Sequence, residues 1–169
     1  AVSVLCVMIA RANGWSNRTV LEKLALGGLL HDIGKKEMPP TLLAKPRARY
    51  TFDEIALYEE HPYRGLKILE TVNGVPDDVA AMVFEHHESA TGQGFPRKLK
   101  DQRINPHARV CILANAFCEL IMPSFDNGPK RSPQEAIRHM KDVMGCPYNK
   151  QLFRSLASIV TQKIEKKAA

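Results

Sequence analysis

The chain has 169 residues, 44% of them hydrophobic, which predicts one domain over residues 1–169 with a single buried core. No apolar run approaches the roughly 18 to 20 uncharged residues of a membrane span, which argues against an integral membrane protein. The net charge of +6 would suit an anionic partner, but much of it lies in the C-terminal lysines. A nucleic-acid polymer is therefore not the expected partner.

Apolar residues recur at helical spacing along almost the whole chain, and no segment alternates as a strand would. Stop and start signals divide the chain into about seven or eight helices joined by short connections. The signals are Asn13-Gly14, Pro39-Pro40, residues 74–76, the loop at 92–96, Pro106, residues 123–129 and residues 145–147. The expected fold class is all-α.

Two capping boxes mark helix starts. Thr51 is followed by Glu54, and Ser132 is followed by Glu135, with Pro133 between them at the first helical position. We expect one helix to begin directly after Thr51 and another directly after Ser132.

The four cysteines show no Cys-x-x-Cys spacing. Cys6, Cys111 and Cys118 stand inside apolar helical patterns, as buried thiols do. They indicate reduced core residues and a reducing compartment, so we expect a cytoplasmic protein.

Four of the six histidines stand beside acidic residues or proline: His31-Asp32, His61-Pro62, and His86-His87 after Glu85. On a helix, neighbouring residues point about 100° apart, so an adjacent pair reaches two neighbouring points rather than one. Imidazole combined with carboxylate suits iron, manganese or zinc, and one carboxylate can bridge two ions. Any one of these histidines alone would be interpreted as a hydrogen-bonded structural residue. Together they predict a two-metal site.

Five short motifs follow one another along the chain: HDIGKKEMPP at 31–40, EEHPYRGLKIL at 59–69, FEHHE at 84–88, GQGFP at 92–96 and HARVCILANAF at 107–117. In order and spacing they resemble the HD-GYP branch of the HD-domain metal-dependent phosphohydrolases. The resemblance implies an all-α HD-domain helical bundle, with a five-helix core plus extra helices. It also implies bound metal ions, usually iron or manganese, and hydrolysis of cyclic-di-GMP.

The resemblance assigns metal-binding roles to motif residues. It makes ligands of His31, Asp32, His61, His86 and His87, with Asp32 also bridging the ions in catalysis. A sixth ligand position falls on Asn115, where the family has aspartate and this chain offers a weaker, neutral amide oxygen.

The resemblance also implies substrate contacts. Lys35 would act on the substrate phosphate as a catalytic point charge, and it follows His31 by about one helical turn. The alternative for Lys35 is a lysine placed at a helix end by the helix dipole. Gly94, Phe95 and Lys130 are the other expected substrate-binding residues.

Three further departures from the family affect activity. Phe95 replaces the tyrosine of the GYP signature, so no phenolic hydroxyl remains. Of the family's Arg-Pro-Tyr-Lys substrate motif, Pro129-Lys130 alone remains, which removes a bidentate arginine. Residues 2–9 carry none of the ligands that many relatives have on the first helix, so we expect two divalent ions, iron or manganese, rather than three.

Three hypotheses remain open at this point. The first is a two-metal phosphodiesterase that hydrolyses a cyclic dinucleotide, cyclic-di-GMP. The second is a catalytically weak or degenerate HD-GYP module that binds a nucleotide or a partner protein such as a diguanylate cyclase domain. The third is an HD phosphohydrolase for another nucleotide. By resemblance, a regulatory domain could precede Ala1.

Overall fold

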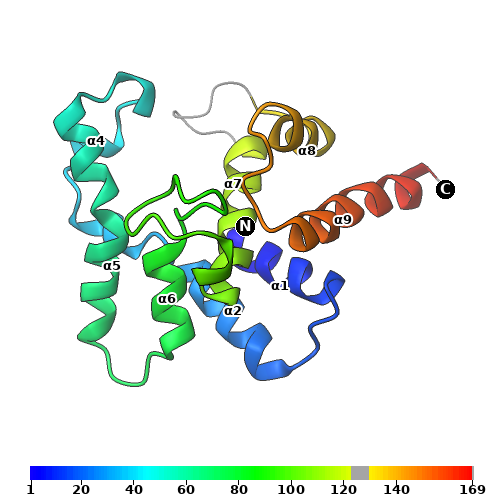
Figure 1. The fold of residues 1–169 in the computed structure, drawn as a ribbon, viewed down its shortest axis with the longest axis horizontal. Helices are drawn as coiled ribbons and strands as arrows, with labels where there is room; N and C mark the ends of the chain where they lie inside the picture. Colours follow the sequence, from blue (N-terminus) through cyan, green and yellow to red (C-terminus); the bar gives the residue numbers. More distant parts are fainter. Residues whose placement is uncertain (123–129, 169) are drawn as a thin grey trace.

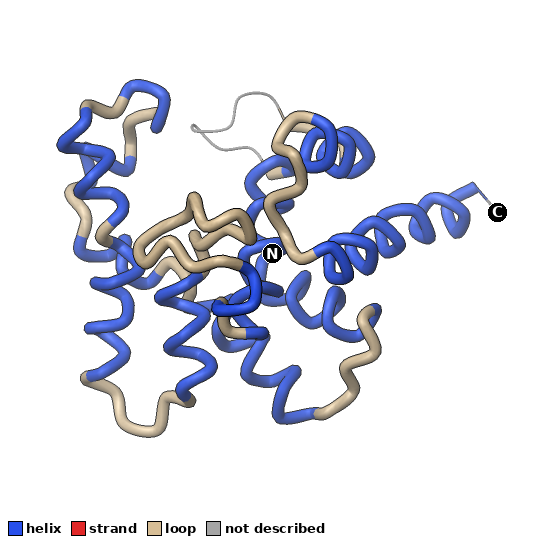
Figure 2. The backbone as a smooth tube through the Cα atoms, in the orientation of Figure 1, coloured by secondary structure: helices blue, strands red, loops and turns tan. Residues whose placement is uncertain are grey.

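The computed structural model describes residues 1–122 and 130–168, and the side chains of residues 1–122 and 130–161. Throughout this described part the chain forms helices and loops without a strand, and a single bridge between Thr91 and Lys100 is its one β-type pairing (Figure 2). The all-α prediction is confirmed. None of the described helices combines the length and the apolarity needed to cross a membrane.

The helices can be followed in Figure 1 by the colour of the ribbon, which runs from blue at the N-terminus to red at the C-terminus. They are α1 (Val2–Ala12), α2 (Arg18–Leu30), α3 (Pro40–Leu43), α4 (Phe52–Glu59), α5 (His61–Glu70), α6 (Asp77–Glu85), α7 (Pro106–Ile121), α8 (Pro133–Asp142) and α9 (Lys150–Ala168). Short 3-10 helices stand between them: η1 (Ile33–Glu37), η2 (Arg47–Arg49) and η3 (Asp101–Arg103). The expected break at 123–129 lies outside the described residues.

Both predicted capping boxes are present. The Thr51 hydroxyl accepts a hydrogen bond from the Glu54 amide at 3.3 Å, and the Glu54 carboxylate accepts one from the Thr51 amide at 2.7 Å. Ser132 and Glu135 make the same reciprocal pair at the start of α8. These caps satisfy backbone N–H groups that a helix leaves without internal partners, which is why α4 and α8 begin at these residues.

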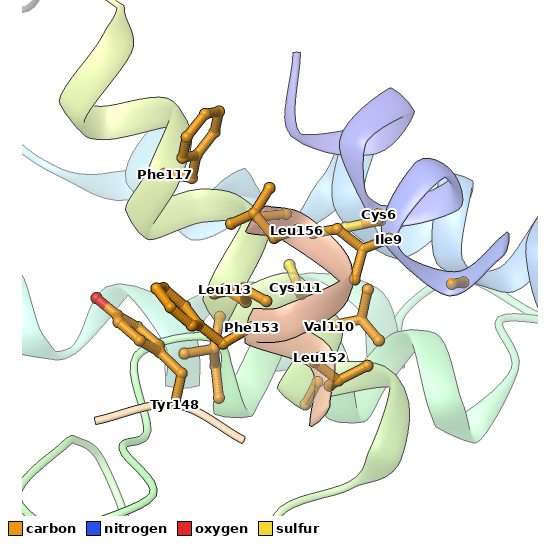
Figure 3. Close-up of a cluster of buried hydrophobic side chains, with 14 of the residues drawn as sticks. Cys6, Ile9, Val110, Cys111, Leu113, Phe117, Tyr148, Leu152, Phe153 and Leu156 are labelled. Carbon is orange, nitrogen blue, oxygen red and sulfur yellow. The ribbon is translucent and has the colours of Figure 1, made fainter. Parts of the chain in front are cut away.

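The main hydrophobic core surrounds α7, which packs against α1, α2, α6, α8 and α9. Because α7 is covered on several sides, its apolar residues do not form one stripe but point to several neighbours. Figure 3 shows this core, with side chains from α1, α7, α9 and the segment before α9: Cys6, Ile9, Val110, Cys111, Leu113, Phe117, Tyr148, Leu152, Phe153 and Leu156.

The thiols belong to this core, as predicted. Cys6, Cys111 and Cys118 are buried, and all four cysteines of the chain are free. Burial raises the pKa of Cys118 to about 11. The neighbouring Cys6 thiol, together with burial, raises the pKa of Cys111 well above its ordinary value. These thiols therefore act as apolar packing groups at neutral pH.

A second, smaller cluster joins the residue after η1 with α3 and α4. Met38, Leu42 and Tyr58 are buried there, with Phe95 partly buried against them. Gly34 makes the approach of η1 to α5 close, since a Cβ at this residue would collide with the backbone carbonyl of His61. Because η1 and α6 both pack against α5, the C-terminal ends of α2 and α6 lie near the N-terminal end of α5.

Candidate metal centre

The candidate ligands lie at helix ends rather than within helices. His31 follows the last residue of α2, His61 opens α5, and His86 follows the last residue of α6. The argument from helical geometry was therefore wrong for His86 and His87. Because α6 ends at Glu85, the backbone turns, and both side chains reach the same group of atoms.

Four ligand side chains converge. One ligand atom from each of Asp32, His61, His86 and His87 lies within 4.8 Å of the others. The Oδ1 atom of Asp32 lies 3.5 Å from His61 Nε2 and 3.4 Å from His86 Nε2. His61 and His86 are buried, so the Oδ1 side of Asp32 faces a closed cluster of imidazoles.

The second oxygen of Asp32 faces different partners. Its Oδ2 atom lies 3.5 Å from His31 Nε2 and accepts a hydrogen bond from Lys35 Nζ at 2.7 Å. His31 thus stands outside the group of four but contacts the same carboxylate. The two oxygens of Asp32 point to two neighbouring places, an arrangement that suits a carboxylate bridging two ions.

Backbone hydrogen bonds fix how the imidazoles present their nitrogens. The Nδ1–H groups of His31, His61 and His86 donate to the carbonyls of Gly28, Tyr58 and Val83 at 3.0, 2.7 and 2.8 Å. In a neutral ring this leaves Nε2 without a proton, and its lone pair is directed at Asp32. Such bonds from the distal ring nitrogen are the usual support of metal-binding histidines.

The protonation states also favour a cation. Burial lowers the pKa of His86 to about 4 and holds the pKa of His87 well below its ordinary value. Burial alone would raise the pKa of Asp32, but the nearby rings of His61, His86 and His31 and the charge of Lys35 hold this pKa well below its ordinary value. At neutral pH His86 and His87 are therefore neutral, and Asp32 is ionised.

Two buried atoms of the cluster have no hydrogen-bond partner among the described residues: Asp32 Oδ1 and His87 Nε2. Buried polar atoms without partners are costly, and an ion that binds them removes that cost. Since the donors are imidazole nitrogen and carboxylate oxygen, the residues fit a transition-metal ion of the iron, manganese or zinc kind.

A cavity of about 430 Å³ opens onto the exposed side of this cluster. His31, Asp32, Lys35 and Asn115 all line it, so Lys35 stands where a ligand near Asp32 would meet its ammonium. Asn115 is buried, and its Nδ2 donates to Glu119 Oε1 at 3.3 Å. Asn115 thus lies in the same cavity as His31 and Asp32, with its amide directed at Glu119.

The GQGFP loop covers the cluster on another side. The Phe95 ring stacks on His87, with centroids 4.6 Å apart and planes 20° apart. The Phe95 amide donates to the His87 carbonyl at 3.1 Å. Gly94 has no room for a Cβ, which would collide with that same carbonyl and with the backbone of Glu88. Both loop residues therefore support His87, and their contact with substrate stays a prediction.

The two glutamates of FEHHE hold this loop. The Glu88 carboxylate accepts hydrogen bonds from the amides of Arg97 and Leu99 at 2.7 and 2.8 Å, and Glu85 accepts one from the amide of Asn105 at 2.7 Å. The acidic residues beside the histidine pair thus fix the chain that follows Phe95, a role that the sequence did not reveal.

Lys130 lies elsewhere. It lines a separate surface groove with Arg131, Arg138 and His139, on and just before α8. Its predicted contact with substrate therefore gains no support from its position, and Pro129 beside it falls outside the described residues.

The cavity is also lined by residues outside the motifs, among them Arg47, Tyr58 and Glu119. Glu119 follows Asn115 by one helical turn on α7, so helical spacing alone could have found it. Arg47 belongs to η2, where no periodic pattern marks a cavity-facing side chain.

The HD domain family matches residues 1–152. A cyclic di-GMP phosphodiesterase of Pseudomonas aeruginosa is 32% identical over 95% of this chain and 38% of its own length. A 3'3'-cGAMP-specific phosphodiesterase of Vibrio cholerae is 30% identical over 86% of this chain and 33% of its own length.

Among solved structures, an HDG"Y"P protein from Bdellovibrio bacteriovorus is similar, with a TM-score of 0.74 and 27% identity. The match covers 95% of this chain and 50% of that protein. This chain thus spans half or less of each relative named here. The comparisons confirm the resemblance to the HD-GYP branch, and the chain belongs to the HD domain family.

Proposed function

We propose that the chain is a metal-dependent phosphodiesterase that hydrolyses a cyclic dinucleotide, and that cyclic-di-GMP is its substrate. One observation carries the proposal: three backbone-anchored imidazoles direct Nε2 at the two oxygens of Asp32, beside a cavity that Lys35 lines. The phosphodiesterases to which the chain is similar act on cyclic di-GMP or 3'3'-cGAMP, which supports this substrate class.

Two divalent ions, iron or manganese, are the proposed cofactors. His61, His86 and His87 would hold one ion on the Oδ1 side of Asp32, and His31 would hold the other on the Oδ2 side. When bound, such ions supply Lewis acidity and water activation for displacement at phosphorus. We expect elemental analysis after anaerobic reconstitution to give about two ions per chain; a value near zero in both metals would contradict the proposed centre.

Side chains of the protein itself supply the other contributions to the proposed reaction. Lys35 donates from its ammonium to a non-bridging oxygen of the scissile phosphate, where it stabilises negative charge as the bond to phosphorus changes. Burial alone would lower the pKa of Lys35, but Asp32 and Tyr58 together raise it above its ordinary value, so the ammonium stays charged at neutral pH. Phe95 shields His87 from solvent and keeps its ring in place.

The decisive test is hydrolysis of cyclic-di-GMP by the iron- or manganese-reconstituted protein, measured beside 3'3'-cGAMP, cyclic di-AMP and mononucleotides. We expect a cyclic dinucleotide to be cleaved faster than any mononucleotide. Turnover confined to mononucleotides would instead identify a phosphohydrolase for another nucleotide. Chromatography of the products would show whether hydrolysis stops at the linear dinucleotide.

A second candidate is a degenerate module that keeps the metal and binds a nucleotide or a diguanylate cyclase domain. Asn115 favours it, because its amide is directed at Glu119 and offers no charge to a metal. Metal content with ligand binding but no turnover would support this candidate. We also infer a cytoplasmic location, since the four free cysteines suit a reducing compartment.

A further inference from the structure

The cavity also contains an ion pair that the proposed hydrolysis does not use. Arg47 Nη2 lies 3.3 Å from Glu119 Oε2, and each side chain is 30% exposed. The two residues come from η2 and α7, which are far apart in the sequence. Both line the same cavity as Asp32 and Lys35, so they stand beside whatever ligand the metal centre holds.

The Tyr58 ring packs against Arg47 of this pair. The Arg47 guanidinium lies 5.6 Å from the centroid of the Tyr58 ring, within the range of a cation–π contact. Tyr58 is buried, and its ring also contacts His61, at 4.8 Å between centroids. The ring therefore fixes Arg47 relative to the metal cluster and acts as a positioning residue.

The pair is poorly suited to a second phosphate. A phosphate attracted by Arg47 would also meet the negative charge of Glu119 at nearly the same place. A neutral ligand that presents acceptors beside donors would instead satisfy both groups. Arginine provides only donors and ionised glutamate only acceptors. The pair can therefore bind a ligand edge that carries donors beside acceptors in one orientation.

We propose that Arg47 and Glu119 recognise a guanine base of the dinucleotide, an inference that rests on the proposed function and names the base it selects. Guanine presents the acceptors O6 and N7, which arginine binds in a bidentate manner. Its N1–H and N2–H groups lie beside O6 and can both donate to one carboxylate. Adenine has an amino group in place of O6, so it would direct a donor at Arg47.

The size of the cavity agrees with one bound nucleotide unit. Its volume of about 430 Å³ lies in the range of small-molecule sites. A nucleotide whose phosphate lies at Lys35 could place its base at the Arg47–Glu119 pair within this same cavity.

The test compares GMP with AMP, which share a phosphate and a sugar and differ in the base. Isothermal titration of the metal-loaded full chain should show tighter binding of GMP. In Glu119→Gln, GMP binding should weaken by about 10- to 100-fold, the usual effect of losing a charged hydrogen-bond partner. AMP binding should change much less. Glu22→Gln is the matched control, because Glu22 forms an exposed ion pair with Arg18 on α2.

Arg47→Lys provides a second, independent variant. It keeps the positive charge but loses the planar pair of donors, so the preference for GMP should fall by about tenfold. Thermal melts of each variant would show that it is folded. A wild-type protein with no preference for GMP, or a preference that survives both substitutions, overturns the inference.

Hydrolysis of cyclic-di-GMP is measured separately from nucleotide binding, so that the two proposals can fail independently. If wild type prefers GMP but cleaves no cyclic dinucleotide, the proposed function fails while guanine recognition stands. If it cleaves cyclic-di-GMP and cyclic di-AMP equally and binds GMP and AMP equally, guanine recognition fails while the phosphodiesterase stands.

Discussion

The Nε2 atoms of His61 and His86 lie 3.1 Å apart, although both rings donate their Nδ1 hydrogen to backbone carbonyls. In neutral rings two lone pairs therefore face each other, with Asp32 Oδ1 close to both. Three electron-rich atoms at such distances repel unless a cation lies between them. The fold thus assembles a cluster that a bound metal ion would stabilise.

Lys35 and Lys36 are neighbours that differ in environment. Lys35 contacts Asp32 within the cavity, whereas Lys36 is exposed. We expect Lys35→Ala to leave the metal content intact and to lower kcat by roughly 10²- to 10³-fold, the usual effect of removing one donor to developing charge. Lys36→Ala should have little effect. Metal analysis and steady-state hydrolysis distinguish the two, and loss of metal in Lys35→Ala would contradict the phosphate role.

Phe95 is expected to act on the metal through His87. Phe95→Ala removes the ring stacked on His87, so metal affinity should fall by about tenfold, in the range found for supporting residues of metal ligands. Phe52→Ala is the control, because Phe52 is 87% exposed. Competition with a metal-binding dye would measure both affinities. Equal affinities would mean that Phe95 covers His87 without positioning it.

The metal-free protein should lose stability as the pH falls. Burial lowers the pKa of His86 from 6.5 to about 4, so between these values the unfolded chain binds a proton that the folded chain does not. Acidification therefore favours unfolding, by roughly 2 kcal/mol at about pH 5.

Urea unfolding at about pH 7 and pH 5 with a chelator would measure this loss. In His86→Gln the dependence should be clearly weaker, because the titrating ring is gone. An identical dependence in both proteins would show that His86 is not the group responsible.

The motifs predicted much of the site because they are local in sequence. His31, Asp32 and Lys35 stand in one motif, and the structure brings His61, His86 and His87 to the same carboxylate. The directions in which the two adjacent histidines, His86 and His87, point were harder to predict. A helical pattern does not show that α6 ends just before His86, and that end decides where both rings point.

The contact between Arg47 and Glu119 could not be predicted in the same way. Arg47 and Glu119 meet through the packing of segments 72 residues apart, and a side chain in a short 3-10 helix has no periodicity that reveals its direction. Glu119 was closer to prediction, since it shares a face of α7 with Asn115.

The last prediction concerns Asn115, which shares the cavity with His31 and Asp32 and donates to Glu119 at 3.3 Å. In Asn115→Asp the hydrogen bond is lost, and the new carboxylate lies one helical turn from Glu119. Like charges at this spacing should destabilise the metal-free protein by about 0.5 kcal/mol. A metal ion would offset this repulsion and gain a charged ligand in place of a neutral one.

Metal affinity should therefore rise, by roughly tenfold, while the metal-free protein melts at a lower temperature. Turnover should rise as well if ligand strength, rather than the missing arginine, limits the wild-type chain. The measurements are metal titrations, melts with and without metal, and hydrolysis assays under identical reconstitution. Asn73→Asp is the control, because it adds the same charge at an exposed residue of the turn between α5 and α6. If Asn115→Asp lowers the melting temperature without strengthening metal binding, Asn115 serves to hold Glu119, and the metal centre is complete without it.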